Sequence, residues 1–331
     1  MEQTKKKMLV IIEILKETDE EHPMTANQIC AELGRRNIKA ERKSVSRDIK
    51  TLSESGMDII MCTDKKKGCY LASRQFEDWE IKILIDAVWQ AQFISQNTSA
   101  NLAGKLLSVT GTESQKTLRQ VTPIHSHVKT ANKTTQIAID VFLRAIRDKR
   151  KVSFQYASMG TDMKLYYRKD GAVYTVSPYS LVWGSEHYYL ICNTNGHEGL
   201  GYYRLDRMHN LKAADESITP AALAAGPDPA SAIDDFVKNS IHHYGGRKTY
   251  LTLKVSPDMM DHLVDQFGMD MIIKSCAASE DEGKYLVTAE TSESDGLYYW
   301  LLQFGSNIEI ISPSSVRAKY IAMLNKILEK Y

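Results

Sequence analysis

The 331-residue chain lacks the features that mark several protein classes. Its five cysteines (Cys30, Cys62, Cys69, Cys192 and Cys276) have neither zinc-finger nor redox spacing, and their odd number disfavours a disulfide framework. No apolar run approaches the roughly 20 residues that span a bilayer. The net charge of +1 disfavours a protein that binds polyanions with its whole surface, so any nucleic-acid binding requires a local basic patch.

The N-terminus resembles a signal peptide only superficially. Lysines at positions 5–7 precede an apolar stretch, but Glu13 interrupts it and no small-residue cleavage site follows. The chain is long enough for two or three domains. These features together predict a water-soluble, cytoplasmic protein of several domains that has no membrane partner.

Enzyme signatures are also missing. The sequence has no Walker loop, no HExxH, no nucleophile elbow and no Rossmann glycine pattern. His125 and His127 are two residues apart, which on a strand could be a metal pair, but no third ligand is nearby, so solvated loop histidines are favoured. We therefore expect no catalytic residues, no metal and no cofactor, and we predict that the protein is not an enzyme.

Residues 173–213 contain short apolar runs separated by turn residues such as Pro178, Gly184 and Gly196. Runs of this length, rich in β-branched and aromatic residues, predict the strands of a small antiparallel barrel or sheet. In a strand, Tyr202, Arg204 and Asp206 would share one face, because side chains alternate. Tyr203, Leu205 and Arg207 would then occupy the opposite face.

Three motifs follow one another in this stretch: Pro178-Tyr179-Ser180-Leu181, Tyr188-Tyr189-Leu190 and Tyr203-Arg204-Leu205-Asp206-Arg207. In order and spacing they resemble the WYL domain, an Sm-like or SH3-like β-barrel of bacterial transcription regulators. Two positions depart from the family pattern. Tyr188 stands where the family name has Trp, and Gly201 stands where the family often has an additional Arg.

The resemblance implies a barrel that senses a negatively charged ligand, such as a nucleotide or a short single-stranded nucleic acid. An aromatic and cationic face suits base stacking combined with phosphate pairing. The residues that we expect to face the ligand are Ser180, His187, Tyr189, Arg204 and Arg207. The alternative is that the aromatic residues belong to the core and that Arg204 and Arg207 pair with Asp206 on the surface, which contributes little stability.

The N-terminal part predicts three helices and a hairpin. Helical spacing of apolar residues covers residues 5–17 and 41–55, and Thr25 with Gln28 has the pattern of a capping box that begins the second helix. Residues 59–71 read as two short strands around a basic turn. This order predicts a winged helix-turn-helix, in which the third helix enters the major groove of DNA.

Basic residues concentrate in this region, with seven basic against two acidic residues between positions 35 and 50. Ser44 to Leu52 also resembles the recognition helix of the DeoR-like heads that precede WYL domains. The expected DNA contacts are Arg42, Lys43, Ser44, Ser46, Arg47 and Lys50 on the helix, and Lys65, Lys66 and Lys67 on the wing. The alternative is an ordinary solvated charged face.

Residues 77–149 read as helices. One apolar stripe comprises Trp79, Ile83, Leu84, Ala87, Val88 and Ala91. Two further helices are expected over about 98–109 and 133–149. Such helices suit a linker that transmits the ligand state and helps the protein to dimerise, or one that only supports packing.

The C-terminal part alternates strands and helices in the order βαββαβ, which predicts a ferredoxin-like sandwich. The segments 300–305 and 310–313 resemble the C-terminal extension of WYL regulators, the WCX domain. Residues 218–231, rich in Pro, Ala and Gly, precede it and read as a linker.

The predicted fold class is a multidomain α+β protein. Its expected parts are a winged helix-turn-helix (1–75), a helical linker (76–150), the WYL barrel (151–217), a second linker (218–247) and the ferredoxin-like extension (248–331). We expect a homodimeric regulator that binds double-stranded operator DNA and responds to a nucleotide or single-stranded nucleic acid. The alternatives are a ligand-independent dimeric DNA-binding protein whose barrel is structural, and an enzyme acting on nucleic acid, which would require a clustered site that the sequence does not show.

Overall fold

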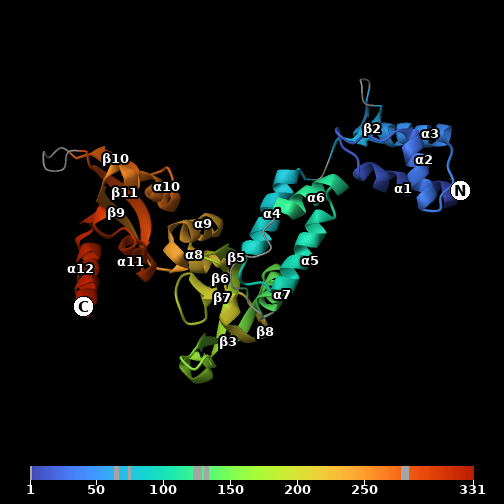
Figure 1. The fold of residues 1–331 in the computed structure, drawn as a ribbon. Coiled ribbons are helices and arrows are strands. Elements are labelled where there is room, and N and C mark those ends of the chain that lie inside the picture. The colour runs from blue at the N-terminus through green and yellow to red at the C-terminus, as the bar shows by residue number, and fades with distance from the viewer. Residues whose placement is uncertain (1, 63–66, 74–75, 122–128, 130–133, 277–282) are drawn as a thin grey trace. The chain divides into compact units, whose positions relative to one another are not determined.

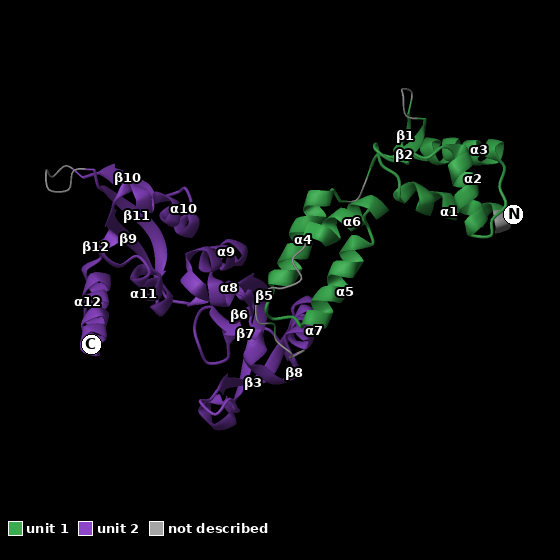
Figure 2. Ribbon diagram, in the orientation of Figure 1, with its two compact units in different colours: residues 1–131 green, residues 132–331 purple. Residues whose placement is uncertain are grey.

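The computed structural model describes residues 2–331 except 63–66, 74–75, 122–128, 130–133 and 277–282 (Figure 1). The chain forms two compact units, residues 1–131 and residues 132–331 (Figure 2). Within the described residues, no helix combines the length and the apolar character that crossing a membrane requires.

The first elements form a body that we call the head. Its elements are α1 (Glu2–Lys16), α2 (Ala26–Arg35), α3 (Arg42–Glu54), β1 (Ile59–Cys62) and β2 (Gly68–Leu71). The predicted capping box is present, because Gln28 N–H donates to Thr25 Oγ1 at 3.3 Å and Thr25 N–H donates to Gln28 Oε1 at 2.8 Å. Two main-chain hydrogen bonds between Met24 and Cys69, 2.9 and 3.0 Å long, join the hairpin to the segment before α2.

Three more helices complete the first unit: α4 (Asp78–Gln90), α5 (Gln96–Leu107) and α6 (Thr112–Val121). The helix α6 lies in the range 77–149 that was predicted to be helical, although it was not predicted as a separate helix. The apolar stripe through Trp79 and Ile83 is not the buried face of α4, since Ile81 and Ile85 are buried whereas the Trp79 side chain is 64% exposed. This helix has apolar residues on more than one side, so its sequence does not single out the face that packs on α5.

The second unit begins with α7 (Thr134–Arg147), which packs on a six-stranded antiparallel sheet that we call the central sheet. The strand order is β4-β3-β5-β6-β7, and β8 pairs with β3. The strands are β3 (Arg150–Met159), β4 (Leu165–Tyr167), β5 (Val173–Gly184), β6 (His187–Thr194), β7 (Gly201–Arg204) and β8 (Met208–Ser217). Phe142 of α7 contributes to one core with Phe154 and Leu190 of the sheet.

One detail of the predicted strand pattern is wrong. The strand β7 ends at Arg204, and a 3-10 turn, η2 (Leu205–Arg207), follows it. The alternation of faces therefore stops at Arg204 and does not place Asp206 and Arg207. The buried Leu205 side chain joins the core instead.

Between the central sheet and the C-terminal sheet lies a segment that we call the connector. Its elements are α8 (Ala221–Ala225), α9 (Pro229–Asn239) and η3 (Ile241–His243). This range was expected to be a linker, and the structure shows helices that touch the central sheet. Tyr179 Oη donates to the Thr219 carbonyl at 2.9 Å, and Tyr202 Oη donates to the Phe236 carbonyl at 3.2 Å.

The C-terminal part has the predicted order of strands and helices. Its elements are β9 (Arg247–Val255), α10 (Met260–Phe267), β10 (Ile272–Ser275), β11 (Tyr285–Glu293), α11 (Asp295–Leu302), β12 (Ile308–Ser312) and α12 (Ser314–Leu328). The sheet order is β10-β11-β9-β12, and each neighbouring pair is antiparallel. Leu251, Leu263 and Trp300 lie in the core between the sheet and its helices.

Candidate nucleic-acid interface and ligand site

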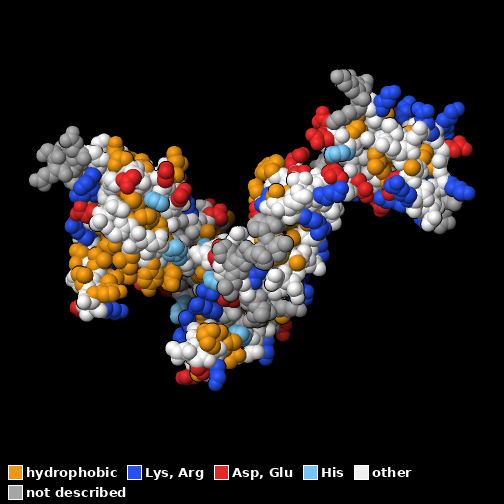
Figure 3. Space-filling view, viewed as in Figure 1, with side chains coloured by type: hydrophobic (Ala, Val, Ile, Leu, Met, Phe, Trp, Pro, Cys, Tyr) orange, Lys and Arg blue, Asp and Glu red, His pale blue; other side chains and the backbone are white. Residues whose placement is uncertain are grey.

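The helix α3 has one buried and one exposed side. Val45, Ile49 and Leu52 are buried in the head core. The side chains that remain exposed are Arg42, Lys43, Ser46, Arg47 and Lys50. Figure 3 shows Lys and Arg side chains gathered along the edge of the head that carries α3. Five of the six residues predicted to contact DNA on this helix are therefore accessible together.

Ser44 is the exception among these six residues, because it is half-buried and faces α1. Lys7 Nζ donates to Ser44 Oγ at 2.6 Å and lies 2.7 Å from Asp48 Oδ2. The Lys7 and Asp48 side chains are each only 11% exposed. This ion pair holds α3 against α1, and sequence reasoning did not find it because the partners lie 41 residues apart.

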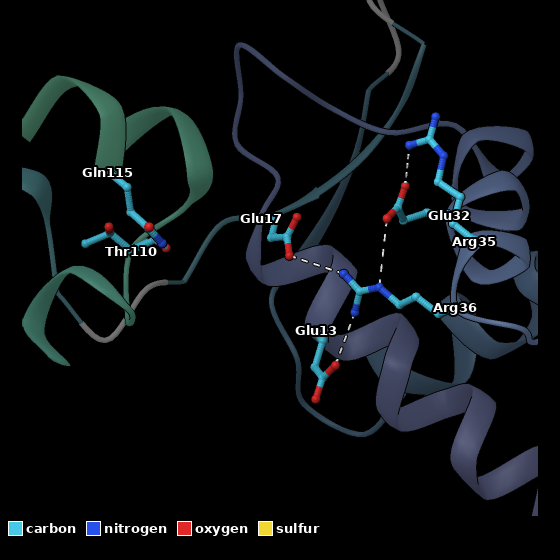
Figure 4. Close-up of polar contacts among 7 residues, drawn as sticks. All are labelled: Glu13, Glu17, Glu32, Arg35, Arg36, Thr110 and Gln115. Atoms are coloured by element: carbon cyan, nitrogen blue, oxygen red, sulfur yellow. Dashed lines mark hydrogen bonds and ion pairs between the residues drawn. The ribbon is translucent and has the colours of Figure 1, made fainter. Parts of the chain in front are cut away.

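The basic residues of the head differ in how far their charge is neutralised. Arg36 lies 3.2 Å from Glu13 and 3.3 Å from Glu17 (Figure 4). Arg35 pairs with Glu32 at 2.8 Å. In contrast, no carboxylate of the described residues lies within ion-pair distance of Arg42, Lys43 or Arg47. The exposed side of α3 therefore carries positive charge that no carboxylate of the described residues neutralises.

The hairpin flanks the same side of α3. A hollow of about 310 Å³ is lined by Ser46 and Lys50 together with Met61 and Gly68 of the two strands. Lys67, at the end of the turn, is exposed. The other two predicted wing contacts, Lys65 and Lys66, lie outside the described residues. The exposed polar side of α3 and the hairpin therefore adjoin one another.

The register of the central sheet brings four of the five predicted ligand residues to one face. Tyr189 pairs with Val182 on β5 and with Arg204 on β7. Because directly paired residues point to the same side and side chains alternate along a strand, Ser180 and His187 lie on this face as well. Tyr202 also lies here, and the opposite face carries core residues such as Leu190.

Arg204 is the centre of a polar network on this face. Its Nε and Nη2 donate to the two carboxylate oxygens of Asp206 at 3.1 and 2.7 Å. Its Nη2 also donates to His187 Nδ1 at 3.2 Å, and its main-chain N–H donates to Tyr156 Oη at 3.1 Å. Since a guanidinium has no acceptor, His187 Nδ1 must accept, and the imidazole proton lies on Nε2.

The charges of this network shift the pKa of its members. Burial lowers the pKa of His187 below its ordinary value, and the charge of Arg204 lowers it further, so the neutral ring is favoured. Burial would raise the pKa of Asp206, but the hydrogen bonds and charge of Arg204 outweigh it and the pKa is lowered. Asp206 is therefore a carboxylate that neutralises Arg204 in part.

Arg207 differs from Arg204. It is half-buried, and no carboxylate of the described chain lies within ion-pair distance of it. A third arginine, Arg168, stands over the Tyr156 ring with 5.1 Å between its guanidinium carbon and the ring centroid. Arg168, Arg204 and Arg207 all influence the Tyr156 hydroxyl electrostatically. Three guanidinium groups and one carboxylate near this ring leave an excess of positive charge that suits an anion.

Tyr189 is not accessible. Its side chain lies beneath the ring of His243, with 4.6 Å between ring centroids, and beside Tyr202 at 6.0 Å. Tyr189 is only 8% exposed as a result. A ligand that stacks on this ring would have to replace the ring of His243.

Sequence reasoning missed three residues of this site: Tyr156, Arg168 and His243. Tyr156 lies on β3, and Arg168 begins the turn after β4, η1 (Arg168–Gly171). No sequence motif marked either residue. His243 comes from the connector, which was expected to be a linker. The only signal in the sequence is the adjacent pair His242-His243, which is too weak to predict contacts with Tyr189 and Tyr202, 54 and 41 positions away.

Two family models match parts of this chain. Residues 138–213 match the WYL domain and residues 247–328 match the WCX domain, so both domains are present. Among solved structures, proteasome accessory factor B/C (PafBC) of Arthrobacter aurescens is similar at 17% identity, 98% coverage of this chain, 49% of that chain and a TM-score of 0.31. A structure described as a CRISPR Cas-related protein is similar at 14% identity, 99% coverage of this chain, 84% of that chain and a TM-score of 0.39.

The chain spans about half of the length of the PafBC chain (49%). Comparison with curated proteins finds no match.

Proposed function

We propose that this chain is a non-catalytic, ligand-responsive transcription regulator whose head binds double-stranded operator DNA. The observation that carries the proposal is the exposed side of α3, where Arg42, Lys43 and Arg47 have no carboxylate partner among the described residues and adjoin the hairpin. We interpret the head as a DeoR-like winged helix-turn-helix in which α3 enters the major groove and Lys67 approaches phosphate.

The central sheet, in this proposal, is an Sm-like barrel that senses a negatively charged ligand such as a nucleotide or single-stranded nucleic acid. The excess of guanidinium groups over carboxylates at Arg168, Arg204 and Arg207 supports an anion. Tyr202 and Tyr189 supply flat rings on the face that carries Arg204, which suit the stacking of a base. A ligand that prefers one arrangement of the chain would shift the DNA-binding population by its differential affinity.

A homodimer completes the proposal, since two heads would read two half-sites of one operator. We interpret the C-terminal sheet and its helices as a ferredoxin-like domain that contributes to the dimer. Figure 3 shows hydrophobic side chains gathered over α11 and α12, and Tyr299, Ile321 and Leu328 are exposed there. The exposed Trp79 and Ile83 of α4 form a second apolar surface for the same purpose.

The test begins with the DNA itself. Sequencing DNA that co-purifies with the protein should give an enriched, two-fold symmetric site, and light scattering should give a dimer on that site. If no sequence is enriched and the protein remains a monomer, both the operator binding and the homodimer are contradicted.

The second candidate function is a ligand-independent DNA-binding protein with a structural barrel. The bidentate pairing of Arg204 with Asp206 and the burial of Tyr189 favour it. The two candidates differ in one measurement, which is whether a 5′-phosphorylated thymidine hexanucleotide changes the affinity of the full-length protein for its operator. A change supports the sensor, and no change supports the structural barrel.

A further inference from the structure

The ring of His243 occupies the exposed side of Tyr189. It lies 4.6 Å from the Tyr189 ring at an interplanar angle of 42°, and 5.5 Å from the Tyr202 ring at 66°. Gly184, at the end of β5, makes this approach possible, because a Cβ atom there would lie 1.8 Å from His243 Nε2. The connector thus inserts a flat ring where the proposed ligand would stack.

This insertion has two local costs. His242 and His243 both have left-handed backbone conformations, with φ of 52° and 56°, which L residues other than glycine rarely adopt. His243 Nδ1 is buried and has no hydrogen-bond partner within the described part of the chain. A buried polar atom without a partner destabilises the docked ring. Withdrawal of the ring would expose Nδ1 to water and so relieve the second cost.

The connector is also attached to the C-terminal domain on both sides of His243. Ile241, which is 2% exposed, belongs to the core of that domain. Tyr244 contacts Tyr299 of α11 edge to face at 6.1 Å. Asn239 Nδ2 donates to Glu290 Oε1 of β11 at 3.0 Å. A displacement of the ring would therefore act on residues that pack against β11 and α11.

We propose that His243 is a built-in occupant of the stacking position on Tyr189, and that a planar anionic ligand displaces it and so signals its presence to the WCX domain. The inference rests on the ligand site proposed above. In this inference the connector competes with the ligand. The apparent affinity for the ligand is then the intrinsic affinity multiplied by the fraction of molecules in which the stacking position is free.

The experiment uses the full-length protein and a 5′-phosphorylated thymidine hexanucleotide, with binding measured by calorimetry. His243→Ala removes the competing ring, so its affinity should rise roughly 3- to 10-fold above that of the wild type. His242→Ala is the matched control, because His242 has the same backbone conformation but an exposed side chain. The control should bind as the wild type does.

A second variant acts on the ring without removing it. In Gly184→Ala the new Cβ expels the ring of His243, so the affinity should rise as in His243→Ala. Hydrogen exchange should also show that the amides of residues 240–246 exchange faster when the hexanucleotide is added to the wild type.

The possible results separate the two proposals. Equal affinities of the wild type and His243→Ala, or unchanged exchange in residues 240–246, would overturn the displacement. The absence of binding in the wild type and in both ring-releasing variants would overturn it too. If instead Arg204→Ala binds the hexanucleotide as the wild type does, the ligand site itself is wrong, and DNA binding by the head is unaffected by that result.

Discussion

Two aspartate pairs, one in each unit, show how burial separates a structural ion pair from one that can exchange partners. In the head, Lys7 and Asp48 are each 11% exposed and come from helices far apart in the sequence. In the central sheet, Arg204 and Asp206 are 23% and 33% exposed and lie two residues apart. Both aspartates adjoin basic residues that we assign to nucleic-acid binding.

The difference in burial predicts a difference in role. Ions removed from water depend on each other strongly, because the loss of one partner leaves the other charged and unsolvated. Partly exposed ions are still hydrated, so another anion can replace the carboxylate at little cost. We therefore expect the pair in the head to maintain the structure that presents α3, and the pair in the sheet to remain available to a ligand.

The largest effect should follow removal of Asp48. Asp48→Ala leaves Lys7 charged and buried, and should lower the free energy of unfolding of the head by about 3–5 kcal/mol. The loss of free energy of unfolding is measured by hydrogen exchange of the α1 and α3 amides. The double variant Lys7→Met/Asp48→Leu should recover most of the stability, since apolar residues of similar volume replace buried pairs well. A loss below about 1 kcal/mol would mean that this pair behaves as an exposed one.

The next effect concerns DNA affinity, with the fold of the head unchanged. Arg47→Ala removes an exposed guanidinium without a carboxylate partner in the described chain, and should weaken operator binding by about 1–3 kcal/mol if Arg47 reads a base. Arg35→Ala is the control, because Arg35 is similarly exposed but paired with Glu32. Equal affinities for the two variants in an anisotropy titration would refute the assignment of α3.

Arg204→Ala tests the partly exposed pair of the comparison, Arg204 with Asp206. It should lower the free energy of unfolding by only about 1–2 kcal/mol, because both partners are partly hydrated. It should nevertheless abolish the response of operator binding to the thymidine hexanucleotide. Lys151→Ala, which breaks the ion pair with Glu216, should leave that response intact. A collapse of the fold in Arg204→Ala would instead favour the structural barrel.

The smallest effect is the pH dependence of the second unit. Burial lowers the pKa of His187 and of His243 in the folded state. The unfolded state therefore binds more protons, and the stability is fully present above the ordinary histidine pKa of 6.5 and decreases as the pH falls below it. The lowered pKa of Asp206 adds a loss only below its ordinary value of 3.8. Thermal unfolding at pH 7.5 and 5.5 should show the decrease, and His187→Gln/His243→Gln should reduce it.

The sequence predicted most elements but few of the contacts between them. Helical spacing and the Thr25–Gln28 pattern located α2, and strand alternation placed Tyr202 with Arg204. Local patterns of this kind are determined by near neighbours in the chain. The 3-10 turn after Arg204 and the exposed face of α4 depend on what packs nearby, which spacing does not encode.

Contacts between residues far apart in the chain could not be predicted from the sequence for the same reason. Lys7 meets Asp48, and His243 meets Tyr189, only because the fold brings the elements together. Whether Tyr189 is a core residue or a ligand-facing residue could not be decided from its place in the motif. In the structure the Tyr189 ring lies against His243 of the connector and beside Tyr202, so the question depends on whether the His243 ring can be displaced.

The paired main-chain bonds between Met24 and Cys69 have a mechanical consequence. They tie the hairpin to the segment before α2, and the two main chains lie so close that a Cβ at Gly68 would be 2.6 Å from the Met24 carbonyl carbon. The hairpin is therefore positioned by main-chain bonds that no side-chain substitution other than proline removes. Under the proposed DNA binding, the spacing between α3 and the hairpin is set already in the free protein.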